Sequence, residues 1–216
     1  TKYYQEDLKK IVSDRIDTIM LPKATIEYVN ELDNILTQIE KEKNMSKKIK
    51  VLPIIELAVS VLQVDVIASL NRVDGILLGA EDLTSDMEVL RTKKSVEIEY
   101  PRARVAMACK AYKIDAIDTP FTDVTDNSGL KEDALHAMQL GMNCKAAIHP
   151  NQLDTINEVF MPSTTQIIWA SRVMKANEEA NAKGLGVFSL DGKMVDKPVL
   201  DRARKILAKA KKFGAI

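Results

Sequence analysis

Short apolar runs alternate with longer amphipathic stretches along most of this chain. The apolar runs predict strands over residues 18–23, 51–56, 75–79, 116–120 and 146–150. Between the runs, apolar positions recur with a helical period and predict helices over residues 26–43, 59–70, 99–112 and 129–140. Strands without a polar face, alternating with helices, are typical of a parallel sheet covered by helices.

The pattern changes after Pro150. Residues 151–183 have a helical pattern throughout, and residues 187–196 resemble a short hairpin that turns at Asp191-Gly192. A basic helix is expected from about residue 198 to residue 212. This tail does not repeat the strand-helix unit, so we expect it to form an appended flap.

The predicted strands end in, or shortly before, polar or charged residues, namely Lys23, Glu56, Asp82, Asp118 and His149. Such residues at the carboxyl ends of parallel strands indicate one shared mouth, as in a (β/α)8 TIM-type barrel. No Gly-rich phosphate loop follows any strand, which disfavours an open doubly wound sheet. A closed barrel needs eight strands. We therefore expect an α/β barrel that lacks its first three strands in this numbering.

We expect one domain in two parts. A partial barrel would occupy residues 1–158, and C-terminal helices with a flap would occupy residues 159–216, packed on the barrel or on a neighbouring subunit. A partial barrel exposes two strand edges, which proteins avoid. We expect further chain, or an intermolecular contact, to cover those edges.

Charge and composition narrow the classes of partner. Lys+Arg and Asp+Glu are equal at 31 each, so the chain has no basic excess for nucleic acid or anionic membranes. No apolar run is long enough to span a bilayer and no signal peptide is recognisable, which predicts a cytoplasmic protein. The two cysteines are too few for a disulfide scaffold.

Glu56 and Asp82 are the candidates for chemistry. Both acids lie near the carboxyl ends of neighbouring apolar runs. Two carboxylates that converge there make a hard oxygen site of the kind that suits Mg²⁺. The alternative is a pair of carboxylates in ordinary ion pairs, which also gather at strand ends.

Five sequence strings resemble, in the same order, those of the citrate lyase β-subunit-like branch of the HpcH/HpaI aldolase family. They are Leu21-Pro22-Lys23, Leu77 to Leu83, Ala116 to Asp123, Lys145 to Pro150, and Gly192 to Asp196. The resemblance implies a (β/α)8 barrel that is a homotrimer or a higher oligomer. It also implies Mg²⁺-dependent cleavage or formation of a carbon–carbon bond in a 3-hydroxyacyl thioester of the citryl-CoA or malyl-CoA type.

The resemblance also assigns roles to residues of the centre. Glu56 and Asp82 would be the metal ligands, and the backbone of Gly79, Ala80 and Glu81 would line the keto-acid pocket. Asp196 would be the acid/base, entering a neighbouring subunit's site. An aspartate before Lys-Pro is equally an ordinary helix N-cap.

Other residues have weaker assignments. Lys23, His149 and Pro150 would contact coenzyme A, although Lys23 also suits a solvated barrel mouth and His149 a structural hydrogen bond. Asp118 and Asp123 suit helix caps or pocket walls. The family's substrate-binding arginine is expected in the N-terminal part that this numbering lacks.

The sequence leaves three functions open. The first is a lyase on a free CoA thioester, which Pro120 and His149 favour. The second is the β subunit of a citrate lyase complex, with an α subunit and an acyl carrier protein as partners, which Leu90-Arg91-Thr92 favours. The third is a non-catalytic barrel, because residues 57–60 read Leu-Ala-Val-Ser where the family usually has Thr or Ser followed by Gly.

Overall fold

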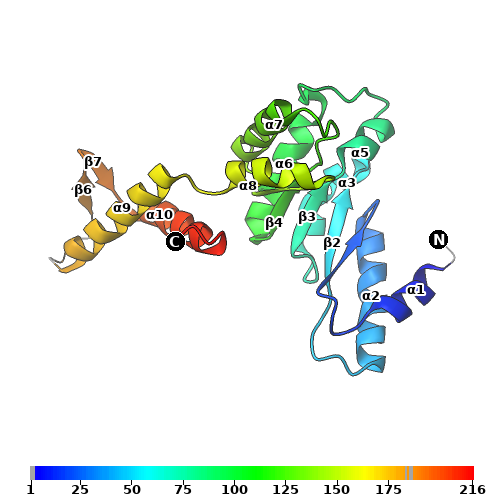
Figure 1. Cartoon of the computed structure of the whole chain (residues 1–216). Helices are drawn as coiled ribbons and strands as arrows, with labels where there is room; N and C mark the ends of the chain where they lie inside the picture. Colours follow the sequence, from blue (N-terminus) through cyan, green and yellow to red (C-terminus); the bar gives the residue numbers. More distant parts are fainter. Residues whose placement is uncertain (1–2, 183, 185–186) are drawn as a thin grey trace. The chain divides into compact units, whose positions relative to one another are not determined.

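The computed structural model describes residues 3–182, 184 and 187–216. The chain forms two compact units, residues 1–156 and 157–216 (Figure 1). The strands of the first unit are β1 (Thr18–Leu21), β2 (Lys50–Ile55), β3 (Gly75–Leu78), β4 (Asp115–Asp118) and β5 (Cys144–Lys145). Its helices are α1 (Tyr4–Ile11), α2 (Ile26–Glu42), α3 (Ala58–Leu62), α4 (Val64–Ser69), α5 (Ala80–Asp86), η1 (Val96–Ile98), α6 (Glu99–Tyr112), α7 (Asn127–Gln139) and η2 (Pro150–Gln152), and α8 (Leu153–Phe160) crosses the boundary.

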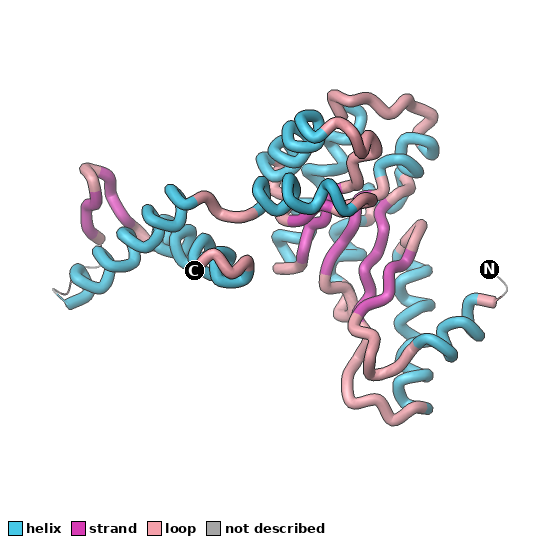
Figure 2. Tube along the Cα trace, in the orientation of Figure 1, coloured by secondary structure: helices cyan, strands magenta, loops and turns pink. Residues whose placement is uncertain are grey.

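The strand order decides between the two architectures that the sequence allowed. The strands lie in the order β1-β2-β3-β4-β5, and every neighbouring pair is parallel. Figure 2 shows the strands side by side in magenta. A doubly wound sheet reverses its order at a switch point, whereas each barrel strand pairs with the next one in the chain. The predicted α/β fold of the barrel type is confirmed, with five parallel strands in the described residues.

The sheet and its helices share one core. All of β3 is buried, and α2 buries Leu32, Leu36 and Ile39 in the same cluster as Ile55 of β2 and Leu78 of β3. Each fully buried side chain of this kind stabilises the fold by about 1.5–3 kcal/mol. The core therefore fixes the carboxyl ends of β2 and β3 next to each other.

Two of the sequence predictions need correction. The single helix expected over 59–70 is two short helices, α3 and α4, which meet at Gln63. The strand expected over 146–150 is instead the two-residue β5, Cys144–Lys145, and the low strand propensity of the following Ala-Ala pair accounts for this. Asp82, expected shortly after the third strand, lies in the first turn of α5. An acidic residue is stabilised there by the helix dipole.

The second unit packs helix α9 (Thr164–Ala182) against α10 (Lys197–Lys212), with the hairpin of β6 (Phe188–Leu190) and β7 (Lys193–Val195) beside them. Asp191 and Gly192 both have positive φ, 54° and 74°, as a two-residue hairpin turn requires. The expected hairpin and basic helix are confirmed. The continuous helix expected over 151–183 is interrupted around Pro162, which cannot donate a backbone hydrogen bond, and position 183 lies outside the described residues.

Two further observations concern the helices and one cysteine. In the described part of the chain, no helix has the length and apolarity needed to cross a bilayer. Cys109 is buried, and its burial raises the pKa of the thiol to about 12. A thiol with such a pKa stays protonated at neutral pH and is inert.

Candidate metal and substrate site

The carboxyl groups of Glu56 and Asp82 come together at the carboxyl ends of β2 and β3. Glu56 directly follows β2 and is 6% exposed, while Asp82 is the third residue of α5. Burial raises the pKa of Glu56, and the charge and hydrogen bonding of the neighbouring Asp82 raise it further, against the N–H of Lys23. A buried carboxyl group whose pKa is raised by a second carboxyl group beside it forms a site that attracts a cation.

Lys23, which follows β1, contacts both Glu56 and Asp82. We call the site formed by Glu56 and Asp82 the corner. The backbone of Lys23 is left-handed, with a φ of 48°, a rare conformation for a residue with a side chain. In this conformation its N–H donates to Glu56 Oε1 at 2.6 Å, and its Nζ lies 3.9 Å from Asp82 Oδ1. The Lys23 side chain is 61% exposed, so it is free to move aside for a ligand.

Gly79 is needed because Glu56 packs directly against it. A Cβ at position 79 would lie 2.7 Å from Glu56 Oε2, 2.8 Å from Glu56 Cβ and 2.9 Å from Ile54 Cγ2. These distances are below any real carbon contact, so a side chain here would displace Glu56. The glycine thus makes room for the metal-ligand candidate itself.

The backbone donors around Gly79 are largely committed to the protein. The Gly79 N–H donates to Ile55 O at 2.9 Å, and the Ala80 N–H donates to Thr119 Oγ1 at 3.2 Å. The first-turn N–H groups of a helix have no partners within the helix. Of the residues predicted to line the keto-acid pocket, Glu81 therefore has the N–H that suits a ligand.

Two further side chains hold the corner, and the sequence pattern did not single them out. Asp86 Oδ2, at the end of α5, accepts from the N–H of Ala58 at 2.7 Å and so caps the start of α3. The hydroxyl of Ser60, which is fully buried, donates to Ala24 O at 2.5 Å and ties α3 to the turn after β1. The departure from the family pattern at residues 57–60 thus still supplies a hydroxyl to this corner.

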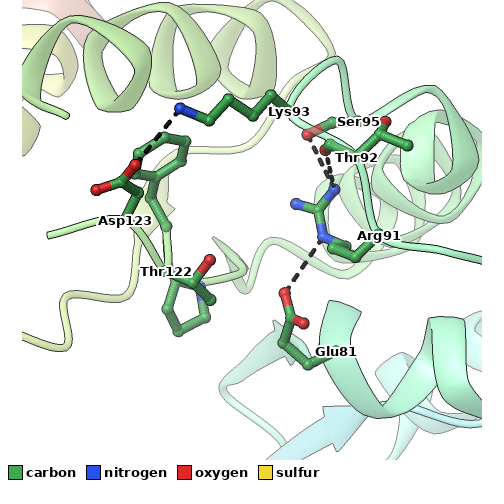
Figure 3. Close-up of a pocket in the computed structure, with 9 residues that line it drawn as sticks. Glu81, Arg91, Thr92, Lys93, Ser95, Thr122 and Asp123 are labelled. Atoms are coloured by element: carbon green, nitrogen blue, oxygen red, sulfur yellow. Dashed lines mark hydrogen bonds and ion pairs between the residues drawn. The ribbon is translucent and has the colours of Figure 1, made fainter.

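A cavity of about 120 Å³ lies beside the first turn of α5 (Figure 3). Glu81 points toward Arg91, with Oε1 and Nε 3.4 Å apart, and Lys93 lies 3.4 Å from Asp123 (Figure 3). Pro120 also lines the cavity. Asp123 is therefore a pocket-wall residue, one of the two roles expected for it.

Asp118 has neither of its expected roles, because it is fully buried in a ring of four charges. We call Arg102, Asp118, Asp133 and Lys145 the buried charge ring. Asp118 pairs with Arg102 at 2.8 Å and with Lys145 at 2.6 Å, and Asp133 pairs with both bases at 2.7 Å. Burial opposes the ionisation of Asp133, but the charges of Lys145 and Arg102 outweigh it and hold the Asp133 pKa below its usual value.

The remaining predicted site residues have local structural contacts. His149 is exposed, and its Nδ1 accepts from the N–H of Asn151 at 3.2 Å, ahead of η2, which begins at Pro150. Asp196 caps α10 by accepting from the N–H of Val199 at 3.3 Å, so its N-cap role is confirmed. Its catalytic role stays a prediction.

The residues at the corner fit a divalent cation. Among the described residues no three His, Cys, Asp or Glu side chains gather as a metal cage. The Glu56–Asp82 pair instead offers hard oxygen donors from one side only. Mg²⁺ is typically held by one or two carboxylates, with its other positions taken by water and substrate.

Comparison with known proteins identifies the family of this chain. A model of the HpcH/HpaI aldolase/citrate lyase family matches residues 1–150. The chain belongs to this family. It is 37% identical to citrate lyase subunit beta of Leuconostoc mesenteroides subsp. cremoris, over 96% of this chain and 70% of that protein. It is 32% identical to L-malyl-CoA/beta-methylmalyl-CoA lyase of Rhodobacter capsulatus, over 97% and 73% of the two chains.

A solved structure extends the comparison to the fold. The crystal structure of protein CitE from Mycobacterium tuberculosis, in complex with magnesium, acetoacetate and coenzyme A, superposes with a TM-score of 0.69. It covers 96% of this chain and 83% of that one, at 22% identity. The family resemblance and the fold that it implied are thus confirmed.

Proposed function

We propose that this protein is a Mg²⁺-dependent carbon–carbon lyase that cleaves a 3-hydroxyacyl-CoA into an acyl-CoA and a 2-keto acid. The substrate would be of the citryl-CoA or malyl-CoA type. The observation that carries the proposal is the contact between the carboxyl groups of Glu56 and Asp82 at adjacent strand ends. The names of two relatives, citrate lyase subunit beta and L-malyl-CoA/beta-methylmalyl-CoA lyase, support it.

Glu56 and Asp82 would hold Mg²⁺. When bound, the ion would act as a Lewis acid and a template for the oxygens of the keto-acid half. Gly79 keeps Glu56 in place, and the Lys23 N–H orients the Glu56 carboxylate. The first turn of α5, at Ala80 and Glu81, would line the pocket of the keto acid.

The reaction needs one proton removed and one returned. The 3-hydroxyl loses its proton, the bond between C2 and C3 breaks, and the acyl-CoA carbon gains a proton, so the overall reaction is balanced. An acid/base group typically contributes about 10²–10⁴-fold. We assign this role to Asp196 of a neighbouring subunit in a homotrimer or higher oligomer, and coenzyme A contacts to Lys23, His149 and Pro150.

The test is release of the keto acid from citryl-CoA and malyl-CoA by the purified protein, with and without Mg²⁺. We expect Mg²⁺-dependent release that Asp82→Asn reduces at least about a hundredfold, because one of two metal ligands is lost. Asp191→Asn, on the exposed hairpin, is the matched acid-to-amide control and should keep wild-type activity. Release that is independent of Mg²⁺, or insensitive to Asp82→Asn, would contradict the proposal.

A second candidate is the β subunit of a citrate lyase complex, acting on a citryl group carried by an acyl carrier protein. It is favoured by the 37% identity to citrate lyase subunit beta. Activity on the carrier-bound thioester, with none on citryl-CoA, would select this candidate. If the protein binds Mg²⁺ but acts on none of these thioesters, the non-catalytic barrel is selected instead.

A further inference from the structure

Helix α5 begins at a residue that cannot cap it. Helices favour Ser, Thr, Asp or Asn at the N-cap because the side chain accepts from a first-turn N–H group. The N-cap of α5 is Gly79, and Glu56 leaves no room for a side chain there. The turn that carries Asp82 therefore starts without a cap of its own.

Thr119 supplies the missing acceptor from the neighbouring strand. It follows β4 directly, is 1% exposed, and its Oγ1 accepts from the N–H of Ala80, which is itself fully buried. A buried backbone N–H without a partner costs about as much as a lost hydrogen bond or more. The first N–H of α5 is thus satisfied by a residue 39 positions later in the chain.

The backbone of Thr119 is fixed in turn by the buried charge ring. Lys145 Nζ donates to Thr119 O at 2.7 Å while it pairs with Asp118 and Asp133. An ammonium held by two buried carboxylates has little freedom to move. The backbone of Thr119 is therefore held rigidly at the point where its side chain contacts α5.

A second chain of contacts reaches the same helical turn. Ser95 Oγ donates to Asp133 Oδ1 at 3.1 Å and accepts from Arg91 Nη1 at 3.1 Å, and Arg91 pairs with Glu81. The first turn of α5 is consequently tied to the buried charge ring at two points, Ala80 and Glu81.

We propose that Thr119 is a positioning residue for the metal-binding carboxylate of Asp82. Its hydroxyl fixes the start of α5, and thereby the distance between the carboxyl groups of Asp82 and Glu56. The inference rests on the proposed function, because it assumes that this pair binds Mg²⁺. Thr119 itself makes no contact with the reacting atoms in this proposal.

The test compares Thr119→Val, which keeps the shape but loses the hydroxyl, with Thr119→Ser, which keeps the hydroxyl. Titration calorimetry with Mg²⁺ alone would give the affinity of each purified variant. We expect Thr119→Val to bind Mg²⁺ about three- to tenfold more weakly, the range of a lost helix cap, and Thr119→Ser to stay within about twofold of wild type.

Thr84→Val is the matched control. Thr84 is also buried, but its hydroxyl donates to the Ala80 and Glu81 carbonyls within the same helix. It therefore does not cap the start of α5. We expect it to lower stability without weakening Mg²⁺ binding. Equal weakening in Thr84→Val and Thr119→Val, or none in Thr119→Val, would overturn the inference.

Hydrogen exchange of the Ala80 amide provides a second readout that needs no variant to fold. First-turn amides normally exchange fast, so slow exchange at Ala80 in the wild-type protein would support the Thr119 cap, and fast exchange would overturn it. If the wild-type protein bound no Mg²⁺, the proposed function would fail. The Ala80 amide would still report separately whether the cap exists.

Discussion

The first unit contains two sites at which two carboxylates lie close together, and the two sites differ in their balance of charge. The buried charge ring combines two acids with two bases, and each acid pairs with both bases. At the Glu56–Asp82 corner two acids meet, and the nearest cation is the exposed ammonium of Lys23, 3.9 Å from Asp82. The ring is balanced by the protein itself, whereas the corner is not.

This difference separates a structural group from a binding site. Buried charges persist when partners satisfy them, and an unpaired buried charge is strongly destabilising. Glu56 is buried like the acids of the ring, yet the charge of Asp82 acts on it more strongly than the charge of Lys23 does. We therefore expect the ring to respond to substitution through stability and the corner through ligand binding.

The largest expected effect tests the ring. Asp118→Asn leaves the facing charges of Arg102 and Lys145 with one acid between them, so we expect unfolding to become easier by about 3–5 kcal/mol. Urea denaturation measures this change. Asp191→Asn, which removes an exposed pair with Arg172, should cost less than about 0.5 kcal/mol. A loss below about 1 kcal/mol in Asp118→Asn would erase the proposed distinction, since buried partners normally cost more.

The second effect tests the corner. In wild-type protein, Mg²⁺ at a hundred times its Kd should raise stability by about 2.7 kcal/mol. We expect Glu56→Gln to abolish this gain and to leave metal-free stability unchanged or slightly higher, because it removes one of two opposed carboxylates. Thermal unfolding with and without Mg²⁺ separates the two quantities. An unchanged Mg²⁺ effect in Glu56→Gln would exclude this residue as a ligand.

A third substitution tests whether space, as well as charge, defines the corner. Gly79→Ala places a Cβ 2.7 Å from Glu56 Oε2. We expect a stability loss of about 1–3 kcal/mol, as for an overpacked core, together with weaker Mg²⁺ binding. Ala80→Gly, one residue later, is the control for backbone effects in the same turn. Wild-type Mg²⁺ affinity in Gly79→Ala would mean that Glu56 moves without consequence.

The last effect depends on pH and concerns the ion pair of Arg91 and Glu97, which lies between the ring and the corner. Burial alone would raise the pKa of Glu97, but hydrogen bonds from Thr92 and Arg91 lower it to about 2, from a usual 4.5. A folded pKa below the unfolded one stabilises the protein above about pH 4.5, and this stabilisation is lost as the pH falls toward 2. We expect Glu97→Gln to lose on the order of 2 kcal/mol at pH 7.

The measurement is stability against pH for both proteins. The wild-type and Glu97→Gln curves should converge as the pH falls from about 5 toward 2, because the wild-type carboxylate is then protonated. Parallel curves over this range would show that the Arg91–Glu97 pair contributes nothing.

Much of the fold follows from local pattern. The runs before Glu56 and around Leu77 are long and apolar enough to predict β2 and β3, and the helical period predicted α6 to the residue. The break at Gln63 was not predictable, because the sequence carries no Pro or Gly there. That break depends on how α3 and α4 pack, which is tertiary information.

The site was predictable only in part. Glu56 and Asp82 are recognisable because they follow strands. Asp118 also lies at a strand end, as the last residue of β4, but it is buried against Arg102, sixteen residues earlier. The roles of Thr119 and Ser60 were not predictable, because their hydrogen-bond partners are backbone groups of residues far away in the chain, the N–H of Ala80 and the carbonyl of Ala24. A hydroxyl that serves a distant backbone leaves no periodic signal.

The closed arrangement of the buried charge ring has a consequence for how this sequence can diverge. Each acid touches both bases, so changing any one member strands two others at once. Any single substitution in the ring destabilises the protein, and only the replacement of several members together leads to another stable core. The exposed loops can vary while the ring stays unchanged, so new substrate specificities would evolve at the barrel mouth and leave the ring intact.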